Sequence, residues 1–455
     1  MKIANQKVTA TQLVKEALEK AERFLDYNIF TFIDKEGALK KAKAIDKKIA
    51  SGEQIGKLAG VPFAIKDNYL SPEGDTTASA HILEGFRSPV TATVVEKLEA
   101  EGAILIGRTN LDAFAHGTST ENSYYGPTLN AHDKERVAGG SSGGSAVAVA
   151  LDIVQFATGS DTGGSIRLPA SFNGVYGLKP TYGANSRYGV VAMCSSTDSM
   201  GFLTKTPEDM DLLMSITAGQ DPKDMTSLPD FYNETEAQPI KRIGIVKDFD
   251  NDAVHKEIRA ALKQKCEELK AKGYEIIELE MPILKYALPA YYIIVPAEVS
   301  SNLSRHDGVR YGFRSEKSDD LGDLYGNTRN EGFMPENKRR IMVGNFVLSS
   351  GFYDAYFLKA AKVRTLIIKG FEEAFKKCDA ILMPVSASPA FKIGEKAGDP
   401  LALYLEDLMT VPANLAGIPG LAVPAGKTEA GLPIGLQLVG PRRSDKSLIQ
   451  FAKEI

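Results

Sequence analysis

The sequence predicts an α/β protein with a mixed, largely parallel central sheet that is surrounded by helices. Short apolar segments of strand length alternate with helical segments in the first half of the chain, an order that is typical of β-α-β units. Residues 61–65, 103–106 and 154–157 have the composition of strands, and residues 92–101 and 146–150 that of helices. The 455 residues are 43% hydrophobic and 25% charged, which are ordinary values for a globular protein.

Further helices and strands are predicted at the N-terminus and in the second half of the chain. Thr9 precedes an apolar periodic run and Gln12 follows three positions later, which predicts the start of a helix. Residues 242–280 are predicted to form a β-α-β lobe, and residues 297–368 are predicted to be mostly helical. Further strands are expected at residues 380–383, 420–423 and 435–439.

Charge and cysteine content exclude several classes of function. The formal net charge is −4, so the chain has no general attraction for phosphate backbones. Cys194, Cys266 and Cys378 are odd in number and far apart, which argues against a disulfide framework and for a reducing compartment. The N-terminus lacks the apolar core of a signal peptide, and no run of 18 apolar residues occurs. We therefore expect a cytoplasmic protein with no membrane span, and clustered metal ligands do not stand out.

Two clusters of serine and glycine carry the most specific signal. The first is GGSSGGS at residues 139–145, the second is DTGGSIR at residues 161–167, and the segment GVPFAIKDN at residues 60–68 precedes both. Neither cluster contains the GxxxxGK[ST] of a Walker loop or the GxGxxG of a dinucleotide-binding turn. Phosphate binding and simple turns are therefore the weaker interpretations.

Together these segments resemble the amidase signature family, whose members cleave amides. The signature covers about residues 56–188, and the resemblance implies the amidase signature fold. It also implies a Ser-Ser-Lys triad, in which Lys66, Ser141 and Ser165 hold the matching positions. In the family the first serine relays the proton, and the peptide bond before it is cis, which corresponds here to the bond between Gly140 and Ser141.

The chemistry of amide cleavage fits these residues. An amide is a poor electrophile, so the enzyme needs an activated nucleophile, here Ser165, and a prepared oxyanion site. None of the five histidines lies in a recognisable triad motif. Lys66 follows an apolar run, and burial would lower its pKa so that the neutral amine acts as the base. Glycine permits the dihedral angles that a nest of N–H groups requires. The candidate oxyanion donors are the backbone N–H groups of Thr162, Gly163 and Gly164.

The second half of the chain selects a group within this family. Several blocks are similar to the A subunits of glutamyl-tRNA(Gln)/aspartyl-tRNA(Asn) amidotransferases, at residues 300–312, 331–342, 348–356, 362–366 and 407–420. With the signature segment, the resemblance spans nearly the whole chain. It implies a single domain over residues 1–455.

This resemblance implies a glutaminase. Glutamine is a zwitterion, so its pocket needs a cation for the carboxylate and an anion for the ammonium group. The matching positions are Arg340 and Asp407, and an arginine can hold a carboxylate by two hydrogen bonds. Tyr291 is a further candidate for the same pocket. His116 stands where many members have methionine, and it either lines the pocket or fills space.

The resemblance also implies a division of labour in a heterotrimer. The A-type chain would hydrolyse glutamine and pass ammonia to a B-type chain, which uses ATP and Mg²⁺ to activate the glutamate on misacylated tRNA(Gln), while a C-type chain steadies the pair. This chain would need no cofactor of its own and would meet tRNA mainly through its partner. The alternatives are a free-standing amidase that acts on small acyl amides and a catalytically silent scaffold. The charged pair Arg340 and Asp407 argues against the first, and the intact triad argues against the second.

Overall fold

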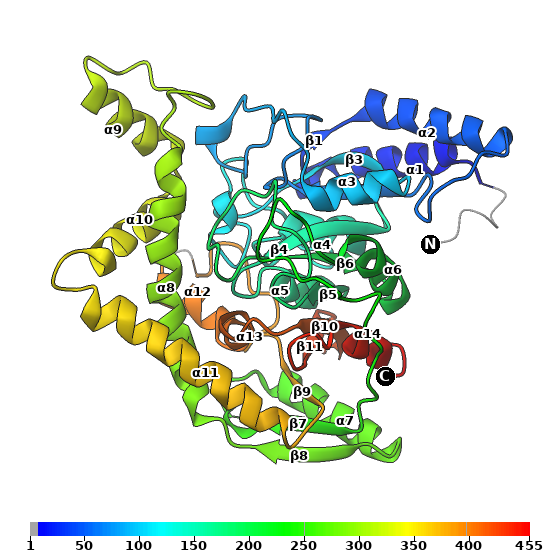
Figure 1. Ribbon diagram of the computed structural model, residues 1–455, viewed down its shortest axis with the longest axis vertical. Helices are drawn as coiled ribbons and strands as arrows, with labels where there is room; N and C mark the ends of the chain where they lie inside the picture. Colours follow the sequence, from blue (N-terminus) through cyan, green and yellow to red (C-terminus); the bar gives the residue numbers. More distant parts are fainter. Residues whose placement is uncertain (1–7, 250, 397) are drawn as a thin grey trace.

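The computed structural model describes residues 8–249, 251–396 and 398–455, and its centre is one mixed sheet (Figure 1). Within these residues, eleven strands lie side by side in the order β1-β3-β2-β4-β6-β5-β10-β11-β9-β7-β8. The predicted mixed α/β architecture is confirmed. The strands are Phe30–Ile33 (β1), Pro62–Lys66 (β2), Ile104–Thr109 (β3), Phe156–Asp161 (β4), Tyr176–Lys179 (β5), Ser199–Thr204 (β6), Arg242–Val246 (β7), Glu275–Leu279 (β8), Ala380–Pro384 (β9), Gly420–Lys427 (β10) and Pro433–Val439 (β11).

Parallel and antiparallel pairing occupy different parts of the sheet. β3, β2 and β4 pair in parallel, and so do β9, β7 and β8. Four strands, in the order β6, β5, β10 and β11, join these two groups by antiparallel pairing. At one edge of the sheet, β1 pairs antiparallel with β3. The expected parallel order thus holds within two groups, while short connections such as the one from β10 to β11 allow antiparallel neighbours between them.

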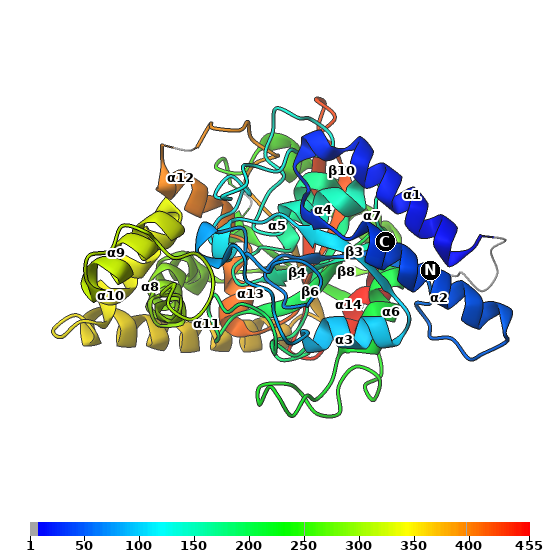
Figure 2. The ribbon, with the colours of Figure 1, turned by 90° about the horizontal axis from the view of Figure 1, so that it is seen from above.

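Helices cover the sheet and form one side of the molecule (Figures 1 and 2). α8, α9, α10 and α11 stand together at the left of Figure 1, away from α1, α2 and α3. The helices are Ala10–Arg23 (α1), Lys35–Ala50 (α2), Thr93–Ala100 (α3), Gly143–Ala150 (α4), Arg167–Asn173 (α5), Pro207–Thr217 (α6), Lys256–Ala271 (α7), Ala287–Asn302 (α8), Leu321–Gly332 (α9), Pro335–Leu348 (α10), Lys359–Phe375 (α11), Pro400–Tyr404 (α12), Val411–Ala416 (α13) and Asp445–Ala452 (α14).

Local sequence signals explain several helix ends. The side chain of Thr9 accepts a hydrogen bond from the N–H of Gln12 at 3.1 Å, so the predicted start of α1 is confirmed. Thr206 begins α6 in the same way, with proline at the next position. α5 and α13 end at Gly174 and Gly417, which both have φ of 68° and so favour glycine.

The core lies between the sheet and its helices. β2, β3 and β4 are buried along their whole length, as expected for parallel strands that are covered on both faces. α8, α9, α10 and α11 make up most of residues 297–368, and β7, α7 and β8 form a β-α-β unit. The division of the chain into domains stays a prediction. No helix in the described ranges is long and apolar enough to span a bilayer.

Candidate active site

The carboxyl ends of β2 and β4 bring Lys66 and Ser160 together. Lys66 is the last residue of β2, and Ser160 lies one residue before the end of β4. Because these strands are parallel neighbours, their ends meet at the same edge of the sheet. Nζ of Lys66 lies 3.0 Å from Oγ of Ser160 and 3.3 Å from its carbonyl oxygen. Asn68 donates from Nδ2 to the same Oγ at 3.0 Å, which fixes the position of Ser160.

Ser141 is the closest hydroxyl to Lys66. Its Oγ lies 2.7 Å from Nζ of Lys66, and both residues are fully buried. The peptide bond between Gly140 and Ser141 is cis, as the resemblance implies. Gly140 packs on Asp112, because a Cβ at this position would lie 2.1 Å from the carboxylate oxygen. The segment before Ser141 therefore requires glycine.

Burial lowers the pKa of Lys66 from 10.5 to about 7. Desolvation disfavours the ammonium form, while the buried carboxyls of Asp112, Asp161 and Asp198 act in the opposite direction. Burial also raises the pKa of Asp112 and of Asp198 to about 6, which weakens their stabilisation of the ammonium in slightly acidic solution. Near neutral pH, a substantial fraction of Lys66 is therefore an uncharged amine that can accept a proton.

Ser165 lies in a second loop that touches the first. The N–H of Ser142 donates to the carbonyl of Ser165 at 3.1 Å. Ser165 is 7% exposed, whereas Lys66 and Ser141 are fully buried, so Ser165 is the most accessible of the three. Within the described ranges, the backbone N–H groups of residues 162–165 have no hydrogen-bond acceptor.

Gly164 gives this loop its shape. Its φ is +147°, and a Cβ there would lie 2.3 Å from Oγ1 of Thr410. Thr410 in turn donates from Oγ1 to the carbonyl of Gly163. The carbonyls of Gly163, Gly164 and Ser165 thus accept hydrogen bonds from other groups, while consecutive N–H groups stay free, and such a nest can bind a negatively charged oxygen.

A buried ion pair anchors the same loop. Nη2 of Arg167 lies 3.1 Å from Oδ1 of Asp161, and Nε lies 3.1 Å from Oδ2. Burial would raise the pKa of Asp161, but Arg167 outweighs it and holds that pKa at about 2. Arg167 also donates to side chains of α13 and β11, those of Asn414 and Gln437. The nest is therefore tied to elements from the end of the chain.

Arg340 lies on α10 in a largely enclosed position. Its Nε donates to Oε1 of Glu336 at 2.9 Å, and its side chain is 5% exposed. The hydroxyl of Tyr404 donates to the same Oε1 at 2.8 Å. Burial would lower the pKa of Arg340, but Glu336 keeps it above its ordinary value, so the guanidinium is charged.

Asp407 lies close to Arg340 and to two tyrosines of α8. Tyr292 donates from its hydroxyl to Oδ2 of Asp407 at 3.0 Å. Burial raises the pKa of Asp407 to about 7, although this hydrogen bond and the charge of Arg340 lower it in part. The hydroxyl of Tyr291 lies over Gly163, where it would be 2.5 Å from a Cβ. Tyr291 thus links the nest to the residues around Asp407.

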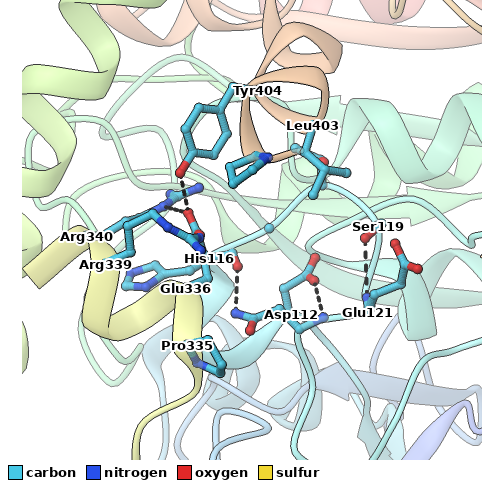
Figure 3. Close-up of a pocket in the computed structure, with 14 residues that line it drawn as sticks. Asp112, His116, Ser119, Glu121, Pro335, Glu336, Arg339, Arg340, Leu403 and Tyr404 are labelled. Atoms are coloured by element: carbon cyan, nitrogen blue, oxygen red, sulfur yellow. Dashed lines mark hydrogen bonds and ion pairs between the residues drawn. The ribbon is translucent and has the colours of Figure 1, made fainter. Parts of the chain in front are cut away.

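A cavity of about 210 Å³ lies against Arg340 (Figure 3). Its wall includes Asp112, which also packs on Gly140, so the cavity adjoins the segment that carries Ser141. His116 lines this wall, and its Nδ1 lies 2.7 Å from Nδ2 of Asn337. Burial lowers the pKa of His116 well below 6.5, so the ring is neutral.

This arrangement has the parts needed for covalent acyl transfer. A buried amine with a lowered pKa contacts a serine hydroxyl, a second serine lies in the adjoining loop, and free N–H groups surround it. In the described part of the chain, no three His, Cys, Asp or Glu side chains are grouped to hold a metal ion.

The Amidase family model matches residues 12–449 of this sequence. This match covers nearly the whole chain, including both glycine-rich loops and the segments around Arg340 and Asp407. The chain belongs to the amidase family.

The similar proteins include members of the family with different activities. The A subunit of glutamyl-tRNA(Gln) amidotransferase from Thermosynechococcus vestitus is 49% identical over 451 residues, with 98% of this chain and 93% of the relative covered. The crystal structure of the protein of that name from Thermotoga maritima has a TM-score of 0.80 and 38% identity, with 99% and 95% covered. A bacterial aryl acylamidase has a TM-score of 0.84 at 25% identity, with 98% and 92% covered. The fold alone therefore does not separate these activities.

The structure adds residues that the sequence analysis did not single out. Ser160 contacts Lys66, Tyr292 holds Asp407, and Glu336 holds Arg340. For two of these, the sequence carried a signal. Ser160 lies between the predicted strand at residues 154–157 and the loop of Ser165, and Glu336 stands four positions before Arg340, the spacing of neighbours on a helix.

Proposed function

We propose that this chain is the glutamine-hydrolysing component of a tRNA-dependent amidotransferase that converts Glu-tRNA(Gln) to Gln-tRNA(Gln) with ATP. The observation that carries the proposal is the buried contact of 2.7 Å between Lys66 and Ser141, next to the loop of free N–H groups around Ser165. The relatives that bear the amidotransferase name support the choice of reaction, since they are similar along nearly the entire chain.

In the proposed mechanism, Oγ of Ser165 attacks the side-chain carbonyl carbon of glutamine. Ser141 takes the proton of Ser165 and gives its own to Nζ of Lys66, while the N–H groups of residues 162–165 stabilise the oxyanion. The proton then returns through Ser141 to the leaving nitrogen, the C–N bond breaks, and ammonia departs. Water cleaves the glutamyl ester of Ser165 by the same route and releases glutamate.

Two charged side chains would hold the zwitterionic end of glutamine. The guanidinium of Arg340 would bind the α-carboxylate, and the carboxylate of Asp407 would bind the α-ammonium group. Both residues are largely buried, so their charges are little screened by solvent. The hydroxyl of Tyr291, which lies over Gly163, would contact the substrate between this end and the nest.

Activation of the glutamate on tRNA would belong to the partner chains of a heterotrimer. We assign ATP and Mg²⁺ to a B-type chain and a stabilising role to a C-type chain, so this chain would need no cofactor. Its formal net charge of −4 supports binding of tRNA mainly through the partner. A cytoplasmic location stays a prediction, which three free cysteines support.

Transamidation with purified components tests this assignment. This chain with glutamine, ATP and Glu-tRNA(Gln) should release ammonia but yield no amidated tRNA. Addition of the B-type and C-type chains should restore amidation, and with Ser165→Ala only free ammonia should support it. Amidation of tRNA by this chain unaided, or binding of tRNA at sub-micromolar affinity, would contradict the proposal.

A free-standing amidase for small acyl amides is the alternative. Propionamide lacks both charges of glutamine, so it gains nothing from Arg340 or Asp407. We expect kcat/KM for glutamine to exceed that for propionamide by about a hundredfold or more. Equal values for the two amides would favour the alternative.

A further inference from the structure

Glu336 engages one edge of the Arg340 guanidinium (Figure 3). The two residues lie one turn apart on α10, and their side chains are 13% and 5% exposed. An arginine has one N–H on Nε and four on its two terminal nitrogens. Glu336 takes the single donor on Nε at 2.9 Å, and the hydroxyl of Tyr404 fixes the accepting oxygen from the other side.

Two aromatic rings lie beside the guanidinium of Arg340. Tyr292 and Tyr404 are stacked with centroids 4.0 Å apart and an angle of 22° between their planes. The central carbon of the Arg340 guanidinium lies 5.4 Å and 5.8 Å from these centroids. Among the residues that the structure places, no acceptor is hydrogen-bonded to Nη1 or Nη2 of Arg340. The guanidinium of Arg340 is thus engaged at Nε, and the edge formed by Nη1 and Nη2 is free.

The negative charge of Glu336 is shared with a second arginine. Oε2 of Glu336 pairs with Arg339, whose side chain is 47% exposed. Burial would raise the pKa of Glu336, but Arg340 and the hydrogen bonds outweigh it, so the pKa lies below its ordinary value. Two arginines and one carboxylate leave this group with a net positive charge. These three residues therefore still attract an anionic ligand, although Asp112 and Glu121 line the same cavity.

We propose that Glu336 is a positioning residue, which sets the edge through which Arg340 binds the α-carboxylate of the substrate. This inference rests on the proposed function, in which Arg340 binds that carboxylate. A carboxylate can meet a guanidinium through Nε and one terminal nitrogen or through both terminal nitrogens. With Nε engaged by Glu336, only the edge formed by Nη1 and Nη2 remains. The substrate carboxylate is therefore held in a single orientation. This orientation in turn directs the side-chain amide of the substrate toward Ser165.

Two effects of removing Glu336 oppose each other. Loss of a competing anion would strengthen the attraction between Arg340 and a carboxylate. Loss of the hydrogen bond at Nε would also let the guanidinium rotate, so a carboxylate could bind in several poses. Because Arg339 already offsets the charge of Glu336, we expect the loss of orientation to dominate.

The test compares two amides on the full chain, by steady-state release of ammonia. The first is glutamine, and the second is 4-aminobutanamide, which is glutamine without its α-carboxylate. For Glu336→Ala we expect kcat/KM for glutamine to fall about tenfold or more, because the reacting amide is no longer directed toward Ser165 by a positioned charge-assisted contact. The value of kcat/KM for 4-aminobutanamide should not change. Glu336→Gln keeps an acceptor oxygen and should lie between wild type and Glu336→Ala.

A matched control is available on another helix. Glu373 of α11 pairs with Lys376, which follows the helix, and both side chains are about two-thirds exposed, so Glu373→Gln should behave as wild type. Equal losses on both amides in Glu336→Ala would indicate a purely structural role and overturn the inference, as would an unchanged or higher kcat/KM for glutamine. If circular dichroism shows that Glu336→Ala does not fold, Glu336→Gln decides by the same criteria.

Failure of the proposed function would look different. In that case the wild-type chain would not prefer glutamine to 4-aminobutanamide, and Arg340→Met would leave KM for glutamine unchanged. A wild-type preference that depends on Arg340 but not on Glu336 would overturn the inference alone.

Discussion

The serine–lysine cluster (Lys66, Ser141 and Ser165) and the arginine–aspartate cluster (Arg340 and Asp407) are built in different ways. The first comes from strand ends and glycine-rich loops in one continuous segment, where positions such as 140 and 164 have no room for a side chain. The second comes from helical elements far apart in the sequence, and side chains rather than backbone define it. Backbone geometry tolerates little change, whereas side chains can be exchanged, so one reactive centre can serve several substrate classes.

Burial acts on both clusters, with opposite consequences for charge. It lowers the pKa of Lys66 to about 7, which favours the neutral amine that can act as a base. It also raises the pKa of Asp407 to about 7, which favours the protonated carboxyl group over the carboxylate. The hydrogen bond from Tyr292 and the charge of Arg340 counteract the second shift. Changes in the serine–lysine cluster should therefore affect kcat, and changes in the arginine–aspartate cluster should affect KM.

The largest effect is expected from Ser165→Ala. Without the nucleophile no glutamyl ester forms, so kcat for ammonia release should fall by about 10⁴-fold or more, while KM for glutamine stays similar. Thermal unfolding should match wild type, because no partner of Oγ is lost among the described residues. Residual turnover near wild type would refute the nucleophile assignment.

Lys66→Arg should lower kcat by about 10²–10⁴-fold, since arginine stays protonated and cannot act as a base. The wild-type profile gives a second measurement. Protonation of Lys66 increases as the pH falls through about 7, so kcat should decline below that pH and reach a plateau above it. Substantial activity of Lys66→Arg would require a different base.

Asp407→Asn should raise KM for glutamine by about 10- to 100-fold with kcat nearly unchanged, because a buried partner of the ammonium group is lost. In wild type, Asp407 gains a proton as the pH falls through about 7, so KM should increase below that pH. The KM of Asp407→Asn should lose this pH dependence. A fall in kcat of similar size would place Asp407 in the chemistry instead.

Tyr292→Phe should have the smallest effect. The hydroxyl of Tyr292 donates to Asp407 and lowers the pKa of that carboxyl, so its loss raises the pKa further. At pH 7 more of Asp407 would then be protonated, and KM for glutamine should rise about two- to fivefold. At pH 8.5 the difference should largely disappear. A pH-independent rise would mean that the hydroxyl contacts the substrate itself.

The sequence predicts the serine–lysine cluster better than its surroundings. The contact of Lys66 with Ser141 and the cis bond before Ser141 follow from short motifs whose backbone demands leave few choices. The strands between the two parallel groups depend on pairing across the sheet, which short apolar runs such as β5 and β6 do not reveal.

The side-chain contacts of the arginine–aspartate cluster were also not predictable in detail from the sequence. The charge of Arg340 acts on Asp407, but Tyr292 rather than its neighbour Tyr291 hydrogen-bonds to Asp407. Which of two adjacent tyrosines faces a carboxylate depends on the rotation of α8 against α10 and residues 405–407. Helix packing of this kind is a tertiary property that local sequence does not determine.

Mass spectrometry of the acid-quenched chain after brief mixing with glutamine tests the central claim most directly. The account predicts a glutamyl ester on the peptide that carries Ser165, present in wild type and absent from Ser165→Ala. It should form far more slowly in Lys66→Arg, because the proton of Ser165 then has no acceptor. A glutamyl adduct on any other residue, or an ester that forms at the wild-type rate in Lys66→Arg, would contradict the account.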